Sequence, residues 1–186
     1  MRIISGKARG TKLYTLEGEE TRPTLDRVKE ALFNIIQSDI QDCIFLDLFA
    51  GSGAIGLEAI SRGASKAILC EKSKQAINII EKNVEKTHTK EKVELYKTDF
   101  KNLLETKLKY IPDIVYIDPP YKTNYAFEAI KLLIEKKNIK EQTTIIVETD
   151  EEERVLKQLE VLPIKITAQK KYGRVHLIFL QGIQDK

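Results

Sequence analysis

Three closely spaced glycines form the first candidate ligand site in the sequence. They lie in DLFAGSGAIG, residues 47–56, where Gly51, Gly53 and Gly56 fit the G-x-G-x-x-G spacing of a dinucleotide-binding loop. Glu71 follows about twenty positions after Gly51, where such sites place an acid for ribose hydroxyls. A loop of this kind brings the backbone close to a ligand beside a helix N-terminus, so it could hold either NAD or S-adenosylmethionine.

Asp47 is the residue that separates these two cofactors. It precedes the glycine loop within an apolar run, and a buried carboxylate is costly unless it is paired or hydrogen-bonded. An acid here would add negative charge beside a pyrophosphate, but it suits a ligand that carries an ammonium and a sulfonium group. The alternative is that Asp47 caps the turn by accepting hydrogen bonds from N–H groups of the loop.

A second candidate site is the segment YIDPPY, residues 116–121. Pro119 and Pro120 remove two backbone donors and fix two φ angles, which makes a rigid corner. The Asp118 side chain and the Pro119 carbonyl could accept the two protons of a base amine, which must pyramidalise before it attacks a methyl group. Tyr121 would hold the base by stacking, which is worth about 1–3 kcal/mol. The alternative is a Pro-Pro loop that merely caps a strand, with Tyr121 on the surface.

Alternating strand-like and helix-like segments position both motifs. Runs rich in Ile, Val, Leu and Tyr predict strands at 43–50, 66–71, 93–99, 113–118 and 143–149. The stretches between them predict helices at 54–62, 73–87, 101–109, 126–137 and 151–160. Near-continuous apolar strands that alternate with helices are typical of a doubly wound, mostly parallel sheet. The corner then follows a strand next to that of the glycine loop, at a topological switch point where ligands bind.

The two ends of the chain depart from this alternation. Residues 163–182 predict two strands joined through KKYGR, which is an antiparallel hairpin. A parallel sheet that ends in such a hairpin resembles the class I S-adenosylmethionine-dependent methyltransferase fold, which is Rossmann-like, rather than a dehydrogenase. Residues 1–20 predict a short β-hairpin arm, and residues 25–37 an amphipathic helix. We therefore expect an arm at 1–20 and one methyltransferase domain at 21–186.

Composition limits the class of protein and its compartment. The 186 residues are 42% hydrophobic and 32% charged, an ordinary balance for a globular domain. No apolar run approaches the roughly 20 residues of a membrane span, and the start lacks the apolar block of a signal peptide. We therefore expect a cytoplasmic protein with no membrane partner. Cys43 and Cys70 are expected to be reduced thiols, and because no Cys/His cluster has metal-ligand spacing we expect no metal.

The net charge of +3 is unevenly distributed. Residues 1–12 and 163–176 carry Lys and Arg but no acid, whereas acids crowd the middle of the chain, as in TDEEER at 149–154. This asymmetry indicates that the two ends share a face that meets nucleic-acid phosphate. The alternative is an ordinary solvated surface.

In combination, the motifs resemble one family. DLFAGSGAIGLEA, DPPY, TRPTLDRVKEALFN and KKYGRVHLIFL are similar to segments of the RsmD family, bacterial enzymes that methylate N2 of one guanine in 16S ribosomal RNA. The resemblance runs nearly the whole chain, from GKARG to YGRVHLIFL. It implies S-adenosyl-L-methionine as cofactor and 16S ribosomal RNA as partner, within a small ribosomal subunit or an assembly intermediate. A monomer is the default expectation.

The resemblance also implies a role for each motif residue at the cofactor. The backbone of Gly51, Ser52 and Gly53 would pass close to the methionine part, with Asp47 near its amino group. Glu71 would accept both ribose hydroxyls. Asp99 would accept the adenine amino group, with Phe100 supplying an N–H and an apolar contact. An alternative for Asp99 is the N-cap of the following helix.

At the substrate, the resemblance implies a catalytic corner and a basic RNA-binding surface. Asp118 would orient the guanine amine at the corner made by Pro119 and Pro120, and Tyr121 would stack on the flipped base. The residues expected to contact RNA are Arg2, Lys7, Arg9, Lys12, Arg22, Arg27, Lys170, Lys171 and Arg174. For Arg22 and Arg27, salt bridges within the helix segment are an equal alternative.

Three other functions stay open at this point. An N6-adenine DNA methyltransferase also uses a D-P-P-Y corner, but the short spacings between strands leave no room for its target-recognition region. An NAD-dependent dehydrogenase would leave Asp47 and the DPPY corner unexplained. A non-catalytic RNA-binding protein of the same fold predicts a damaged loop or corner, and both motifs are intact here.

Overall fold

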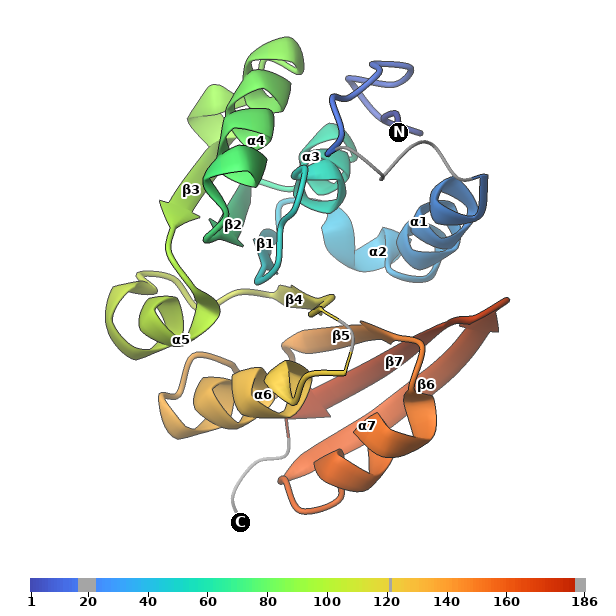
Figure 1. Ribbon diagram of the computed structural model, residues 1–186, viewed down its shortest axis with the longest axis vertical. Coiled ribbons are helices and arrows are strands. Elements are labelled where there is room, and N and C mark those ends of the chain that lie inside the picture. Colours follow the sequence, from blue (N-terminus) through green and yellow to red (C-terminus); the bar gives the residue numbers. More distant parts are fainter. Residues whose placement is uncertain (17–22, 121, 183–186) are drawn as a thin grey trace.

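A single mixed sheet with helices on both faces organises the computed structural model, which describes residues 1–16, 23–120 and 122–182, the side chains of 23–25 and 107 excepted (Figure 1). The strand order is β3-β2-β1-β4-β5-β7-β6. The strands are β1 (Ile44–Asp47), β2 (Lys66–Glu71), β3 (Val93–Lys97), β4 (Ile114–Ile117), β5 (Thr144–Thr149), β6 (Ile164–Tyr172) and β7 (Val175–Gly182). Strands β1 to β5 are parallel, and β7 pairs antiparallel with β5 and β6. This confirms the predicted fold class.

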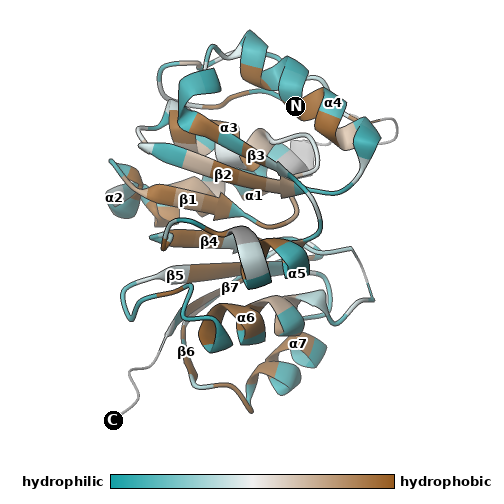
Figure 2. Ribbon diagram, turned by 90° about the vertical axis from the view of Figure 1, so that its left-hand side faces the viewer, coloured by the Kyte–Doolittle hydropathy of each residue, from teal (hydrophilic) through white to brown (hydrophobic). Residues whose placement is uncertain are grey.

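Helices cover the sheet in two layers because the central strands are apolar on both faces. One face packs against α1 (Pro23–Ile35), α2 (Gln37–Ile40), α3 (Ala54–Ser61) and α4 (Lys74–Lys86). The other packs against α5 (Phe100–Asn102), α6 (Tyr125–Glu135) and α7 (Glu152–Leu159). Figure 2 shows the central strands β1, β4 and β5 largely in the colours of hydrophobic residues, with polar colours on the surface helices α4 and α7. Among the described residues, no helix has the length and apolar character to cross a membrane.

The helix expected at 101–109 differs from the one observed. After three α-helical residues the chain forms a π-helix at Leu103–Lys107. The Leu104 carbonyl accepts a hydrogen bond from the Asn138 side-chain amide at 2.9 Å, and the Leu108 N–H donates instead to the Leu103 carbonyl at 3.1 Å. The Asn138 side chain therefore occupies the carbonyl that an α-helix would pair with the Leu108 N–H, and the backbone hydrogen bond moves one residue back, as in a π-helix.

The expected N-terminal hairpin has one antiparallel bridge among its described residues, between Arg2 and Lys12, and backbone hydrogen bonds cross it on either side of that bridge. Ile3 and Leu13 pack against Leu57 of α3, and the Lys7 N–H donates to the Ser61 carbonyl at 2.8 Å. The described part of the arm, residues 1–16, thus contacts α3 from the start of that helix to its end.

Candidate active site

A cavity of about 830 Å³ opens at the carboxyl edge of the parallel strands, within the usual size of a small-molecule site. Its wall includes both sequence motifs. Because β1 pairs with β4, and Asp47 lies opposite Tyr116, the glycine loop and the Pro-Pro corner meet at the switch point of the sheet. Val28 and Lys29 of α1, with Met1, line another side of the cavity.

The glycine loop has the backbone that a ligand site of this kind requires. Gly51 and Gly53 have φ values of 54° and 79°, in the left-handed region that favours glycine. Apart from Gly51 itself and its two chain neighbours, no described residue has an atom within 4 Å of the point where a Gly51 Cβ would be, so a ligand can approach this backbone. At Gly56 a Cβ would lie 2.3 Å from a methyl carbon of Leu69, so the third glycine lets α3 pack closely on β2.

Asp47 is the buried charge of the site. Its side chain is 1% exposed, and it accepts a hydrogen bond from the Phe49 N–H at 3.2 Å. Burial raises the pKa of Asp47 to about 7, the Phe49 hydrogen bond opposes this, and the nearby Glu71 and Glu148 carboxylates add to it. The turn-capping contact is therefore present, and the same carboxylate is poorly compensated and faces a cavity where a cation would stabilise it.

Glu71 is fixed by backbone donors. One carboxylate oxygen accepts from the Gly51 N–H at 2.9 Å, and the other accepts from the N–H groups of Lys72 and Ser73, each at 2.8 Å. A carboxylate has about four lone-pair positions, so roughly one stays open to a ligand. The expected contact to both ribose hydroxyls stays a prediction, and here Glu71 also ties the glycine loop to the end of β2.

An aromatic wall stands beside Asp99. Asp99 accepts a hydrogen bond from the Asn102 N–H at 3.1 Å and caps α5, as the alternative reading proposed, while it also lines the cavity. The Phe100 ring lies 5.1 Å from that of Phe49 and 5.3 Å from that of Tyr125. The sequence did not point to Phe49 or Tyr125, because only the fold brings these rings together. The rings of Phe49 and Tyr125 are nearly parallel, at 5°, and the Phe100 ring is tilted against both, so the three form an apolar aromatic surface against which a planar ring can pack.

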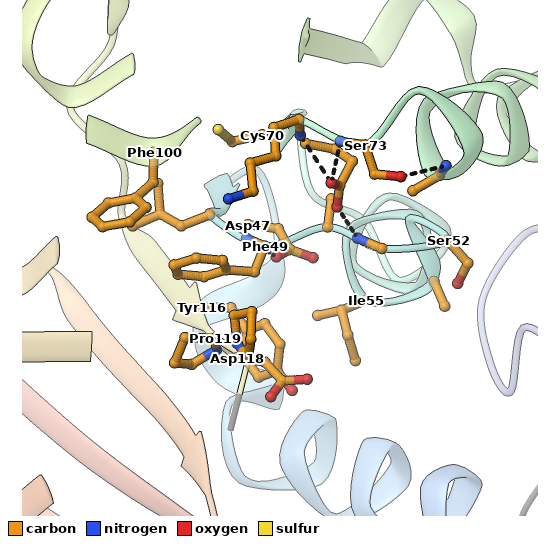
Figure 3. A pocket seen from close by; sticks show the side chains of 18 of the residues that line it. Asp47, Phe49, Ser52, Ile55, Cys70, Ser73, Phe100, Tyr116, Asp118 and Pro119 are labelled. Carbon is orange, nitrogen blue, oxygen red and sulfur yellow. Dashed lines mark hydrogen bonds between the residues drawn. The ribbon is translucent and has the colours of Figure 1, made fainter. Parts of the chain in front are cut away.

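The Pro-Pro corner lies across the cavity from the loop. Figure 3 shows Asp118 and Pro119 beside Tyr116, below Asp47 and Phe49. The Pro120 carbonyl accepts from the Thr123 hydroxyl at 2.8 Å, and the Arg154 guanidinium donates to the Thr123 carbonyl at 3.0 Å. These contacts fix Pro120 and Thr123, which lie at the C-terminal side of the corner. Tyr121 lies outside the described residues.

Glu148, at the end of β5, is a cavity residue that the sequence analysis missed. Its carboxylate accepts a hydrogen bond from the hydroxyl of Tyr116, which is 3% exposed. Burial raises the pKa of Glu148, and the Tyr116 hydrogen bond acts in the opposite direction. Burial, together with Glu148 and Asp118, raises the pKa of Tyr116 well above its ordinary value. The available signal was an acid at the end of an apolar strand, TTIIVET.

A buried ion cluster ties α1 and the arm to α3 beside the cavity. The Glu58 carboxylate, fully buried, lies 3.4 Å from the Lys29 ammonium and 2.8 Å from the Arg62 guanidinium. It also accepts from the N–H groups of Ile4 and Ser5 at 2.8 and 3.0 Å. Burial lowers the pKa of Lys29, and Glu58 opposes that shift.

Asn83 of α4 makes a second link between the arm and the site. Its amide donates to the carbonyls of Tyr14 and Ser52, each at 2.9 Å, and it accepts from the Tyr14 N–H at 2.8 Å. One buried side chain therefore holds both the arm and the glycine loop.

The structure places the basic candidates in more than one location. Lys171 is paired with His176, which also pairs with Thr149 at the end of β5, so the β6–β7 turn lies at the cavity edge of the sheet. Lys170, Lys171 and Arg174 belong to this turn region. In Figure 1 the turn and the N-terminal arm lie toward the same side, with α1 between them.

The remaining basic candidates follow the arm and α1. Arg2 and Lys12 face each other across the bridge, and Arg2 is 4.0 Å from the Asp26 carboxylate of α1. Lys7, and with it the turn that contains Arg9, lies at the Ser61 end of α3, away from the cavity edge. Arg27 is exposed on α1. Arg22 lies outside the described residues. Within the described part of the chain, no three His, Cys, Asp or Glu side chains gather as a metal site would require.

Comparisons with known proteins agree with this architecture. The family model described as Conserved hypothetical protein 95 matches residues 1–181. The ribosomal RNA small subunit methyltransferase D of Haemophilus influenzae is 38% identical over 160 residues, which is 84% of this chain and 82% of that protein. The solved Escherichia coli protein yhhF is 30% identical, with a TM-score of 0.83 and coverage of 99% of both chains. A precorrin-6y C5,15-methyltransferase from Geobacter metallireducens, 18% identical, covers 98% of this chain and 100% of its own with a TM-score of 0.70, and shares the fold.

Proposed function

The chain belongs to the RsmD family of ribosomal RNA small-subunit methyltransferases, and on this premise we propose that it methylates the exocyclic N2 amine of a guanine in 16S ribosomal RNA, with S-adenosylmethionine as methyl donor. One observation carries the proposal. The glycine loop with Asp47 and the corner with Asp118 end adjacent strands and face one cavity. A cofactor and a base bound at these two motifs would meet.

The residues of the loop side fit the proposed cofactor. When bound, S-adenosylmethionine supplies a methyl group activated by a positively charged sulfur. The Asp47 carboxylate would bind the cofactor's ammonium group, and the open backbone at Gly51 would lie against its methionine part. The aromatic wall at Phe100 would pack against the adenine, next to Asp99.

The residues of the corner side fit a base amine. The Asp118 carboxylate and the Pro119 carbonyl would accept the two N2 protons and favour the pyramidal amine that can attack. Holding the amine in line with the methyl group supplies much of the rate, because the orientation is fixed in advance. The amine loses its proton after it becomes cationic, so no strong base is needed. Tyr121 is the proposed stacking partner.

The basic residues fit an RNA partner. A guanine must leave its helix or loop to enter the cavity. Lys170, Lys171 and Arg174, near the cavity edge, would hold phosphates around the extruded base, and Arg2 and Lys12 would extend that contact. Such a substrate would place the enzyme in the cytoplasm, as a monomer on a small ribosomal subunit or its precursor.

Two measurements test the proposal. In cells that lack this protein, nucleotide mapping of small-subunit RNA should show the loss of one N2-methylguanine. In vitro, Asp118→Ala should retain cofactor binding and lose about 100-fold or more in turnover. Asp150→Ala, which removes an exposed acid that does not line the cavity, is the matched control and should keep wild-type activity. Near-wild-type turnover of Asp118→Ala, or an unchanged guanine map, would contradict the proposal.

A further inference from the structure

The proposed reaction leaves one hydrogen-bond donor of the target base without a partner. Guanine presents an N1–H beside its N2 amine on the Watson–Crick edge, and flipped bases are commonly read along that edge. The N2 protons are assigned to Asp118 and Pro119. If the pocket buried the adjacent N1–H without an acceptor, binding would be weakened by the full free energy of removing that N–H group from water.

We propose that Glu148 accepts a hydrogen bond from N1–H of the target guanine, and that Tyr116 positions Glu148, so that this pair selects guanine among purines. The inference rests on the proposed function and extends it to base specificity.

The position of Glu148 follows from strand register. Ile117, the last residue of β4, pairs with Val147 of β5, so the next residues, Asp118 just after β4 and Glu148 near the end of β5, lie side by side. Such strands lie about 4.8 Å apart. Both side chains line the cavity, on its corner side. Two neighbouring acceptors therefore stand where two neighbouring donors of one base edge are expected.

The orientation of Glu148 is set by Tyr116. The Tyr116 hydroxyl donates to the Oε2 atom of Glu148, and within the described residues this is the one hydrogen bond of that carboxylate. Tyr116 is buried in the strand β4, so its hydroxyl is held by the packed core. The second oxygen, Oε1, is left to accept from a ligand in the cavity.

A carboxylate at this place discriminates by donor and acceptor pattern. In its ionised form, which the Tyr116 hydrogen bond favours against the effect of burial, the Glu148 carboxylate only accepts hydrogen bonds. It then matches the N1–H of guanine and opposes an N1 that is itself an acceptor. Sites built around a hydrogen bond reject analogues that lack it, because their own buried groups are then unpaired. A Glu148 that served packing alone would have no influence on which base is methylated.

The test changes the hydrogen-bond donors and acceptors of both partners in the proposed contact, the base and residue 148. Small-subunit RNA carries either guanine or 2-aminopurine at the methylated position; 2-aminopurine keeps the amine but has an acceptor at N1. Wild-type protein should prefer guanine in kcat/KM by about 10- to 100-fold. In Glu148→Gln, the Tyr116 hydroxyl should hold the amide oxygen and turn the NH2 toward the base. The preference should then shift at least about tenfold toward 2-aminopurine.

Controls separate this inference from the proposed function. Glu152→Gln removes a carboxylate on α7, 2.7 Å from the His176 ring, and should keep the wild-type preference. 2-Aminopurine also lacks the 6-oxygen of guanine. This loss affects all variants equally, so it cancels when their base preferences are compared.

If wild-type protein methylates no guanine in this RNA, the proposed function itself fails. If guanine is methylated but Glu148→Gln keeps the wild-type preference, only the inference is overturned. Should Glu148→Gln not fold, Tyr116→Phe decides: a weakened guanine preference supports the inference and an unchanged one overturns it.

Discussion

Asp47→Asn is expected to stabilise the protein and to weaken its cofactor binding. Asp47 is almost fully buried, and the Phe49 N–H is its one hydrogen bond among the described residues. Its pKa is raised to about 7 from an ordinary value of 3.8. Asparagine keeps the oxygen that accepts from Phe49 and removes the charge.

The size of the effect follows from proton linkage. Between pH 4 and pH 7 the unfolded chain has lost the Asp47 proton while the folded protein keeps it, so wild-type stability falls as pH rises through this range. About three pH units at 1.36 kcal/mol each amount to about 4 kcal/mol. The free energy of unfolding of Asp47→Asn should therefore gain about 4 kcal/mol relative to wild type between pH 4 and pH 8. Any constant cost of the new amide drops out, because it is the same at both pH values.

Two assays measure the two halves of this prediction. Urea unfolding of both proteins at pH 4, 6 and 8 gives the stability difference. Calorimetric titration with S-adenosylhomocysteine, which carries the same ammonium group, should show about 10- to 100-fold weaker binding to the variant at pH 8. Wild-type affinity should itself decline below about pH 7, as Asp47 takes up a proton. Parallel stability curves of the two proteins across this pH range, or equal affinities at pH 8, would refute the reasoning.

Three further changes test other parts of the structure. Glu58→Gln leaves the buried Lys29 and the partly buried Arg62 without their carboxylate, and should lower the free energy of unfolding measured in urea by about 3–5 kcal/mol; a loss under about 1 kcal/mol would contradict the importance of this ion cluster. Gly6→Ala places a Cβ 1.8 Å from the Ser61 carbonyl oxygen, so it should detach the arm and expose it to proteolysis. Gly10 has a similar φ but open space around it, so Gly10→Ala should lower the free energy of unfolding by only about 1–2 kcal/mol and leave the arm protected from protease. Arg174→Ala should lower the slope of log affinity for RNA against log salt by about 1, and an unchanged slope would place Arg174 outside the RNA contact.

The parallel sheet and both motifs could be predicted because their signals are local. Apolar runs, glycine spacing and the Pro-Pro dipeptide each lie within a few residues, and the order of the runs fixes which strand ends meet. The π-helix at Leu103–Lys107 could not be predicted in this way, since it depends on Asn138, which is distant in sequence. Glu148 and Lys29 were missed for the same reason. A single acid in an apolar strand, or one lysine in an amphipathic helix, gives no sign of its partner until the fold supplies Tyr116 or Glu58.

Asn83 donates hydrogen bonds to both Tyr14 of the arm and Ser52 of the glycine loop, so the stability of the arm is coupled to the state of the ligand site. Coupling between two equilibria is reciprocal, so if docking of the arm favours ligand binding at the glycine loop, ligand binding favours docking of the arm by the same coupling free energy. Hydrogen exchange at the Tyr14 amide, which donates to the Asn83 side chain, should slow when a ligand fills the cavity. A spectroscopic label near Tyr14 would then report how much of the protein has ligand in the cavity, without altering a proposed catalytic residue.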